Sequence, residues 1–206
     1  MELLNSRKER VNNYLILFIQ GECNIADMPR NKFIYTFRQV FVFLFLITST
    51  MANAQKLTSV ASVDLNKYMG TWHEIASYPQ RFQKGCHCTT ATYTLSDKGY
   101  VIVENKCKRD STSGKESYIK GKAFVVKNSG NAKLKVQFFW PFKAKYWIID
   151  LADDYSYAVV SHPNKKYLWI LCRTPKMDDT VYKGILARLK EKGFDLDKLQ
   201  LTPQCK

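Results

Sequence analysis

The chain has 206 residues, a length that predicts one ordinary domain with an appendage. It carries 32 Lys and Arg against 18 Asp and Glu, a formal net charge of +14 at pH 7. The lysines are spread along the predicted strands rather than clustered, which argues against nucleic-acid binding. A solvated basic surface or contact with an anionic lipid surface accounts for this charge.

The first 54 residues have the pattern of a targeting segment. Basic residues between positions 30 and 38 precede an apolar run at residues 40–47, and the small-x-small sequence Ala-Asn-Ala follows at residues 52–54. This order is typical of a cleaved secretory signal peptide. The apolar run is too short to span about 30 Å of hydrocarbon, so a permanent membrane helix is not expected.

Three segments follow from this pattern. A cleaved signal peptide is predicted over residues 28–54, because Met28 lies just before the basic stretch. Residues 1–27 are interpreted as an upstream extension of the reading frame or as a disordered leader. Residues 55–206 form the predicted domain, and Gln55 stands where a lipid anchor would need cysteine. We therefore expect an exported protein, periplasmic or secreted, that is soluble.

After residue 68 the sequence reads as a succession of short strands. Apolar and polar residues alternate with a period of two, which indicates one buried and one solvated face on each strand. Turn sequences at residues 96–99 and 128–131 join neighbouring strands, and such short connections make the strands antiparallel. The predicted strands are residues 71–78, 89–95, 100–107, 118–126, 133–139, 145–151, 156–161 and 166–173.

Eight antiparallel strands are the number that closes a barrel around one small ligand. The predicted fold class is therefore all-β, an eight-stranded antiparallel up-and-down β-barrel. One C-terminal α-helix follows, with Asp178 or Asp179 as its N-cap and Gly193 at its end. We expect the apolar face of this helix to pack on the outside of the barrel, through Val181, Ile185, Leu186 and Leu189.

Five cysteines follow the predicted cleavage site, at positions 86, 88, 107, 172 and 205. In an exported protein disulfides are the default, and an odd number leaves one thiol free unless it pairs between molecules. The C-x-C spacing at residues 86–88 is narrower than that of a zinc knuckle. No metal and no cofactor is predicted.

Two separated motifs resemble the signatures of the lipocalins. Residues 64–76 (DLNKYMGTWHEIA) are similar to the first signature, a short turn followed by G-x-W at Gly70 and Trp72. Residues 167–175 (YLWILCRTP) are similar to the last-strand signature, and its arginine is Arg173 here. The resemblance implies that Arg173 stacks on Trp72 and seals one end of the barrel. The chain looks closest to the bacterial outer-membrane lipocalin and apolipoprotein D group.

This resemblance also implies a disulfide pairing. Apolipoprotein D-like members tie the second strand to the C-terminal tail, which maps onto Cys88 and Cys205. Cys86 and Cys107 then form the second bond, although exchanging Cys86 with Cys88 fits the spacing nearly as well. Cys172 is left as the free thiol, and strand alternation points it outward beneath the helix.

Family resemblance and strand alternation together imply a binding site inside the barrel. The expected function is transport or storage of a small hydrophobic ligand, a fatty acid or lysophospholipid, with envelope lipid maintenance as one setting. Phe82 resembles residues that cap the mouth, and Lys84 or Lys143 would meet an acidic head group. The predicted wall consists of Ala91, Tyr93, Ile119, Gly121, Ala123, Val125, Leu134, Val136, Phe138 and Trp169.

Two other functions fit parts of the sequence. A thiol-dependent isomerase of this family would use an inward-facing cysteine, but Cys172 has outward parity and the other four are expected in disulfides. A tetrapyrrole or retinoid carrier would use His87 or His162 only if they faced the pocket, and both lie in predicted loops. We expect no enzymatic activity. The expected partners are the hydrophobic ligand and an anionic membrane surface, with the protein a monomer or a weak homodimer.

Overall fold

The computed structural model describes residues 56–205. The predictions for residues 1–27 and for a signal peptide over residues 28–54 therefore lie outside the described residues. Within the described range, no helix has the length and apolar character needed to cross a membrane.

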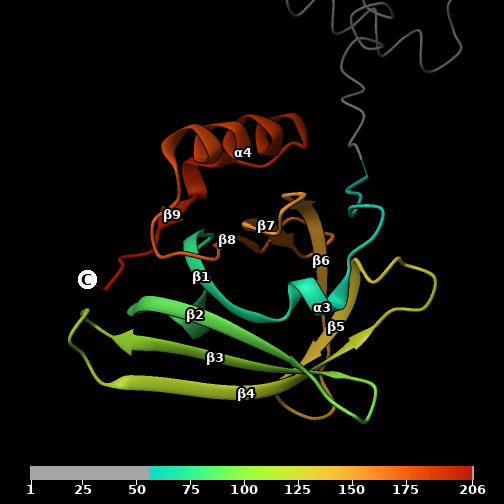
Figure 1. Cartoon of the computed structure of the whole chain (residues 1–206). Coiled ribbons are helices and arrows are strands. Elements are labelled where there is room, and N and C mark those ends of the chain that lie inside the picture. The colour runs from blue at the N-terminus through green and yellow to red at the C-terminus, as the bar shows by residue number, and fades with distance from the viewer. Residues whose placement is uncertain (1–55, 206) are drawn as a thin grey trace, which may run out of the picture. The chain divides into compact units, whose positions relative to one another are not determined.

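Eight strands form a closed antiparallel barrel (Figure 1), which confirms the predicted fold class. Each strand from β1 to β7 pairs with the next in the chain, and β1 closes the ring by pairing with both β2 and β8. A ninth short strand adds to the second half of β1. The bounds are β1 Gly70–Ser77, β2 Cys86–Leu95, β3 Val101–Arg109, β4 Glu116–Val125, β5 Lys133–Gln137, β6 Ala144–Leu151, β7 Tyr157–Ser161, β8 Leu168–Cys172 and β9 Gln200–Leu201.

Most strand ends differ from the predicted ones by one to three residues, and one strand was not predicted. Strand β2 begins at Cys86 rather than at residue 89, because its start pairs with the end of β3. Strand β5 ends at Gln137 rather than at residue 139, and Pro141 soon follows in the loop, where it has no N–H to give to a ladder. Strand β9 was not expected, since two residues carry no readable period.

The loops of an up-and-down barrel alternate between its two ends. The short helix α3 (Leu65–Tyr68) precedes β1 and marks one end, which we call the closed end. The opposite end we call the mouth. The loops at the mouth are residues 78–85, 110–115, 138–143 and 162–167.

Helix α4 (Asp179–Glu191) lies outside the barrel, as predicted (Figure 1). Asp178 is its N-cap, and the Asp178 carboxylate accepts hydrogen bonds from the backbone N–H groups of Thr180 and Val181. Gly193, at φ +73°, follows the last turn in a conformation that glycine adopts without strain. The helix thus begins and ends where the sequence indicates.

The buried face of α4 is rotated slightly from the predicted one. Ile185 and Leu189 are buried against apolar residues of β6, β7 and β8, and Leu186 is partly buried. Val181, however, is 39% exposed, so its assignment to this face was wrong. Tyr182 takes that place, because it lies three and seven residues before Ile185 and Leu189.

Two disulfides hold β2 to its neighbours. Cys86 bonds Cys107 on β3, and Cys88 bonds Cys205 in the C-terminal tail. This is the pairing that the resemblance implies, and the exchanged alternative does not occur. Cys172 is free and buried beneath α4, on the outward face that alternation assigned to it.

Candidate functional site

The closed end is sealed around Trp72. This indole is fully buried, and its Nε1 donates a hydrogen bond of 2.9 Å to the Tyr68 carbonyl. The Arg173 guanidinium lies 3.7 Å from the Trp72 ring centroid and donates to the Lys67 carbonyl. Gly70 has φ +94°, and a Cβ there would lie 3.4 Å from Arg173. The G-x-W motif and the arginine therefore form one structural unit, as the resemblance implies.

The residues of the predicted wall gather on the inward face of the barrel. Ile119, Gly121 and Ala123 alternate along β4, and this parity places Ile119 on the same face as Ala123. The interior cluster buries some members and leaves others partly accessible. Tyr93, Ala123, Leu134 and Val136 are buried, whereas Ala91, Val125, Phe138 and Trp169 pack against them and stay partly accessible.

The solvent accessibility of the inward side chains differs between the two ends of the barrel. At the closed end, Trp72, Val101 and Ile148 are fully or almost fully buried. Toward the mouth, the inward side chains of Ile119 and Trp169 keep part of their surface accessible. The interior is thus fully buried at the closed end and partly accessible near the mouth.

Gly121, a predicted wall residue, has no open space beside it. A Cβ at this position would lie 2.7 Å from the Phe138 ring, so the ring already occupies the volume that the glycine leaves. The pair is complementary, because a larger residue at 121 would displace Phe138. Space for a ligand must come from the other wall positions.

Three tyrosines meet inside the barrel, and we call them the tyrosine floor: Tyr68 from α3, Tyr93 from β2 and Tyr146 from β6. The Tyr146 hydroxyl oxygen lies 2.8 Å from that of Tyr68 and 2.9 Å from that of Tyr93. Burial raises the pKa of Tyr93 to about 12 and raises the pKa of Tyr68 and of Tyr146 well above the usual value for a phenol. These hydroxyls are therefore neutral donors and acceptors at physiological pH.

The tyrosine floor predicts loss of stability at alkaline pH. An unfolded phenol ionises near pH 10, whereas the folded floor keeps its protons, so the stabilisation is complete below about pH 10. It should decline as the pH rises through about 12, the raised pKa of Tyr93. Ultraviolet phenolate titration should show these phenols ionising last in the native protein and with the others in urea. Titration of all phenols together in the native state would contradict this.

Asn105 is an inward-facing residue that the sequence analysis missed. It pairs with Ala91 on β2 and with Ile119 on β4, both predicted wall positions. Its Oδ1 atom is buried and has no hydrogen-bond partner among residues 56–205. The period-two alternation of Val101, Val103 and Asn105 along β3 indicates that Asn105 faces inward.

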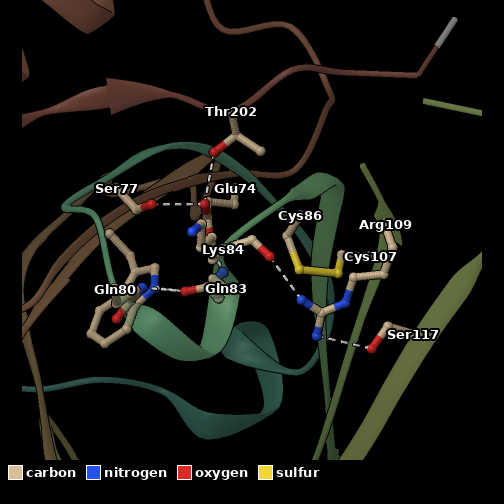
Figure 2. Close-up of a disulfide and its surroundings, with 11 residues drawn as sticks. Glu74, Ser77, Gln80, Gln83, Lys84, Cys86, Cys107, Arg109, Ser117 and Thr202 are labelled. Carbon is tan, nitrogen blue, oxygen red and sulfur yellow. Dashed lines mark hydrogen bonds between the residues drawn. A yellow bond between two sulfur atoms is a disulfide. The ribbon is translucent and has the colours of Figure 1, made fainter. Parts of the chain in front are cut away.

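A buried carboxylate organises one side of the mouth (Figure 2). Glu74 is 5% exposed and accepts hydrogen bonds from Ser77 Oγ at 2.9 Å and from Thr202 Oγ1 at 2.7 Å. Gln83 Nε2, from the short helix η2 (Arg81–Gln83), donates to the same carboxylate at 2.7 Å. Gln83 Oε1 in turn accepts from Trp169 Nε1 at 3.0 Å. Glu74 therefore ties β1, the C-terminal tail and the mouth loop together.

Arg109 is a cation at the mouth that was not predicted from the sequence. Arg109 lies at the end of β3, and its guanidinium donates to the Lys84 carbonyl at 2.9 Å and to Ser117 Oγ at 3.2 Å (Figure 2). In the described part of the chain no carboxylate lies within 4.0 Å of it. Lys143 was a wrong choice, because its Nζ lies 4.1 Å from the ring centroid of Phe124, on the outward face of β4.

Exposed aromatic side chains surround the mouth, and we call them the aromatic rim: Phe82, Phe139, Trp140, Phe142 and Tyr167. Trp140 is 87% exposed, Phe142 77% and Phe139 69%. Phe82 was predicted to cap the mouth; it lies on η2 with its ring exposed, 6.2 Å from that of Tyr167. Monomeric proteins rarely expose aromatic groups in such a cluster without an interaction to make.

The residues considered for a tetrapyrrole carrier or a thiol enzyme do not lie together in one site. His87 lies on β2 rather than in the expected loop, and His162 lies in a mouth loop, where its Nδ1 accepts from the Asn164 N–H. Cys172 is buried under α4 and faces away from the interior. Among residues 56–205 there is no group of three or more His, Cys, Asp or Glu arranged to hold a metal ion.

Comparison with known proteins gives a consistent result. Residues 63–204 match the family model described as a lipocalin-like domain. The chain is 37% identical to temperature-induced lipocalin-1 of Arabidopsis thaliana over 163 residues, 75% of this chain and 86% of that protein. It is 39% identical to outer membrane lipoprotein Blc of Escherichia coli K12 (76% and 88% covered) and 36% identical to mouse apolipoprotein D (68% and 77% covered).

Among solved structures, insecticyanin from the tobacco hornworm Manduca sexta is similar, with a TM-score of 0.60. The likeness covers 73% of this chain and 85% of that one, at 22% sequence identity. At this identity the likeness supports the barrel fold alone.

Proposed function

Because the chain belongs to the lipocalin family, whose members bind small hydrophobic ligands, we propose that its barrel carries a single-chain lipid, a fatty acid or a lysophospholipid. The ligand is bound and released without chemical change. The observation that carries the proposal is the accessibility of inward side chains near the mouth, in contrast to the buried closed end. Apolar side chains seal the closed end, while Ile119 and Trp169 keep accessible surface toward the mouth.

An acyl chain gains enough from such a wall to bind without ionic help. Each buried methylene contributes about 0.8 kcal/mol, so about ten of them gain roughly 8 kcal/mol before the cost of ordering the ligand. That free energy corresponds to affinity near the micromolar range. The wall residues supply the apolar contact that this estimate requires.

Arg109 supports an acidic head group at the mouth. Its guanidinium is held by two neutral oxygens, those of Lys84 and Ser117, which leave donors free for an anion. Guanidinium binds both carboxylate and phosphate through paired hydrogen bonds. Arg109 therefore takes the role that the sequence analysis gave to Lys84 or Lys143.

An anionic membrane is the proposed source or destination of the lipid. The aromatic rim surrounds the opening through which a ligand passes, and aromatic side chains are enriched where proteins meet the lipid interface. Lys135, Lys143 and Lys145 flank the most exposed part of the rim, and all three are exposed. Each basic residue near an anionic surface contributes about 1 kcal/mol of attraction. An exported protein with this mouth would transport or store lipid of the envelope.

Filling the barrel tests the proposal. Ala91→Trp places an indole on the inward face of β2, whose register partner on β1 is Trp72, and should lower affinity for dodecanoic acid and for a lysophospholipid at least tenfold, as measured by isothermal titration calorimetry of the delipidated protein. Thr94→Trp is the matched control, because Thr94 lies on the exposed outward face of the same strand. Wild-type protein that binds neither lipid would overturn the proposal.

A further inference from the structure

The interior of this barrel is not uniformly apolar. The tyrosine floor has three hydroxyl protons, but its two oxygen–oxygen contacts use only two of them. In every arrangement of these bonds, one phenol proton is left without an acceptor among the described residues. The floor therefore offers a hydrogen-bond donor that its own members do not satisfy.

Asn105 places a second polar group beside the floor. Tyr93 pairs with Val103, and Asn105 is the next inward residue along β3, so Tyr93 and Asn105 are diagonal neighbours on one face. Such neighbours have Cα atoms about 7–8 Å apart. A half-turn of the Asn105 amide exchanges its donor and acceptor ends, so it can meet either kind of group. The floor and Asn105 together form one region, which we call the deep polar region.

A plain alkyl chain is a poor match for the deep polar region. Burying donors and acceptors against methylene groups leaves their hydrogen bonds unmade, which disfavours binding. A hydroxyl on the chain can accept the free phenol proton and donate its own to the amide. The phenols have raised pKa values and stay neutral, so the region favours a neutral oxygen group over an ionised one.

We propose that the deep polar region binds an oxygen-bearing group on the chain of the ligand, so that an ω-hydroxy or similarly oxygenated fatty acid is preferred over the unsubstituted acid. This rests on the proposed function and narrows its ligand class. Asn105 lies four residues from Arg109 on β3, about 13 Å along the strand. Val103, the β3 partner of Tyr93, lies about 20 Å from Arg109 along the same strand. With the acid head at Arg109, the oxygen therefore belongs toward the far end of the chain.

A matched pair of ligands tests this inference. Dodecanoic acid and ω-hydroxydodecanoic acid are titrated into the delipidated protein, with isothermal titration calorimetry as the readout. The expected result is about tenfold tighter binding of the hydroxy acid, although its hydroxyl makes it the more water-soluble of the two. Asn105→Leu should remove most of this preference while retaining the binding of dodecanoic acid.

Asn105→Leu also provides a check on folding. It replaces a side chain that has an unpaired buried oxygen with an apolar one of similar size, so thermal stability should not fall. Equal affinity for the two acids in the wild type, or an undiminished preference in Asn105→Leu, would overturn the inference and leave the proposed function standing. Failure of both acids and of a lysophospholipid to bind would overturn the proposed function itself.

Discussion

Trp72→Ala is expected to lower the free energy of unfolding by about 3–5 kcal/mol, the usual range for truncating a fully buried tryptophan. Trp72 has no exposed surface, its Nε1 donates to the Tyr68 carbonyl, and Arg173 stacks on its ring. The substitution opens a cavity at the densest part of the interior. It also leaves the guanidinium without the ring it covers. Since small domains are stable by about 5–15 kcal/mol, urea denaturation should show the change clearly.

Trp140→Ala is the matched control for this substitution. The same side chain is removed, but from a position that is 87% exposed, so the free energy of unfolding should change by less than about 0.5 kcal/mol. A Trp72→Ala protein as stable as the wild type would contradict the role of Trp72 in sealing the closed end. Comparable losses in the two variants would show that the loss is not specific to the buried site.

The double substitution of Trp140 and Phe142 by serine is expected to lower partitioning onto anionic vesicles about a hundredfold. Full burial of a large apolar side chain is worth about 1.5–3 kcal/mol, and two such side chains inserted only in part lose roughly 3 kcal/mol together. Both residues are highly exposed, so folding should be unaffected. Vesicles of phosphatidylcholine with phosphatidylserine, co-sedimented with the protein, provide the measurement.

Two controls separate this interaction from simple charge attraction. Val181→Ser removes an exposed apolar residue from α4, outside the barrel and away from the mouth loops, and should leave partitioning unchanged. Vesicles without anionic lipid should bind the wild type more weakly, because the lysines then contribute little. Unchanged binding of the double variant would exclude the aromatic rim as the membrane contact.

Much of the barrel could be predicted because strand alternation is a local property. The inward positions of Ala123, Leu134 and Val136 follow from a period of two, which neighbouring residues impose through the pleat of the strand. The same rule placed Cys172 on the outward face. The Trp72–Arg173 contact joins residues 101 positions apart, and its prediction came from the resemblance to the lipocalins rather than from alternation.

The errors arose where a side chain from another segment of the chain decides the outcome. Gly121 was predicted as part of the wall, but Phe138, from the loop after β5, fills the volume beside it. Lys143 was predicted to meet an acidic head group, yet it lies over Phe124 on the outside. Composition alone could not distinguish these cases, because each depends on which neighbouring side chain packs at the position in the folded barrel.

The sequence by itself determined the class of fold, the order of the strands and the outward placement of α4, because periodicity, turns and caps act over a few residues. Only the tertiary structure decided which polar groups meet inside. Tyr68, Tyr93 and Tyr146 come from a helix and two strands far apart in the chain, and closure of the barrel brings their hydroxyls together. Hydrogen-bond partners are set by distance in space, which no local pattern encodes.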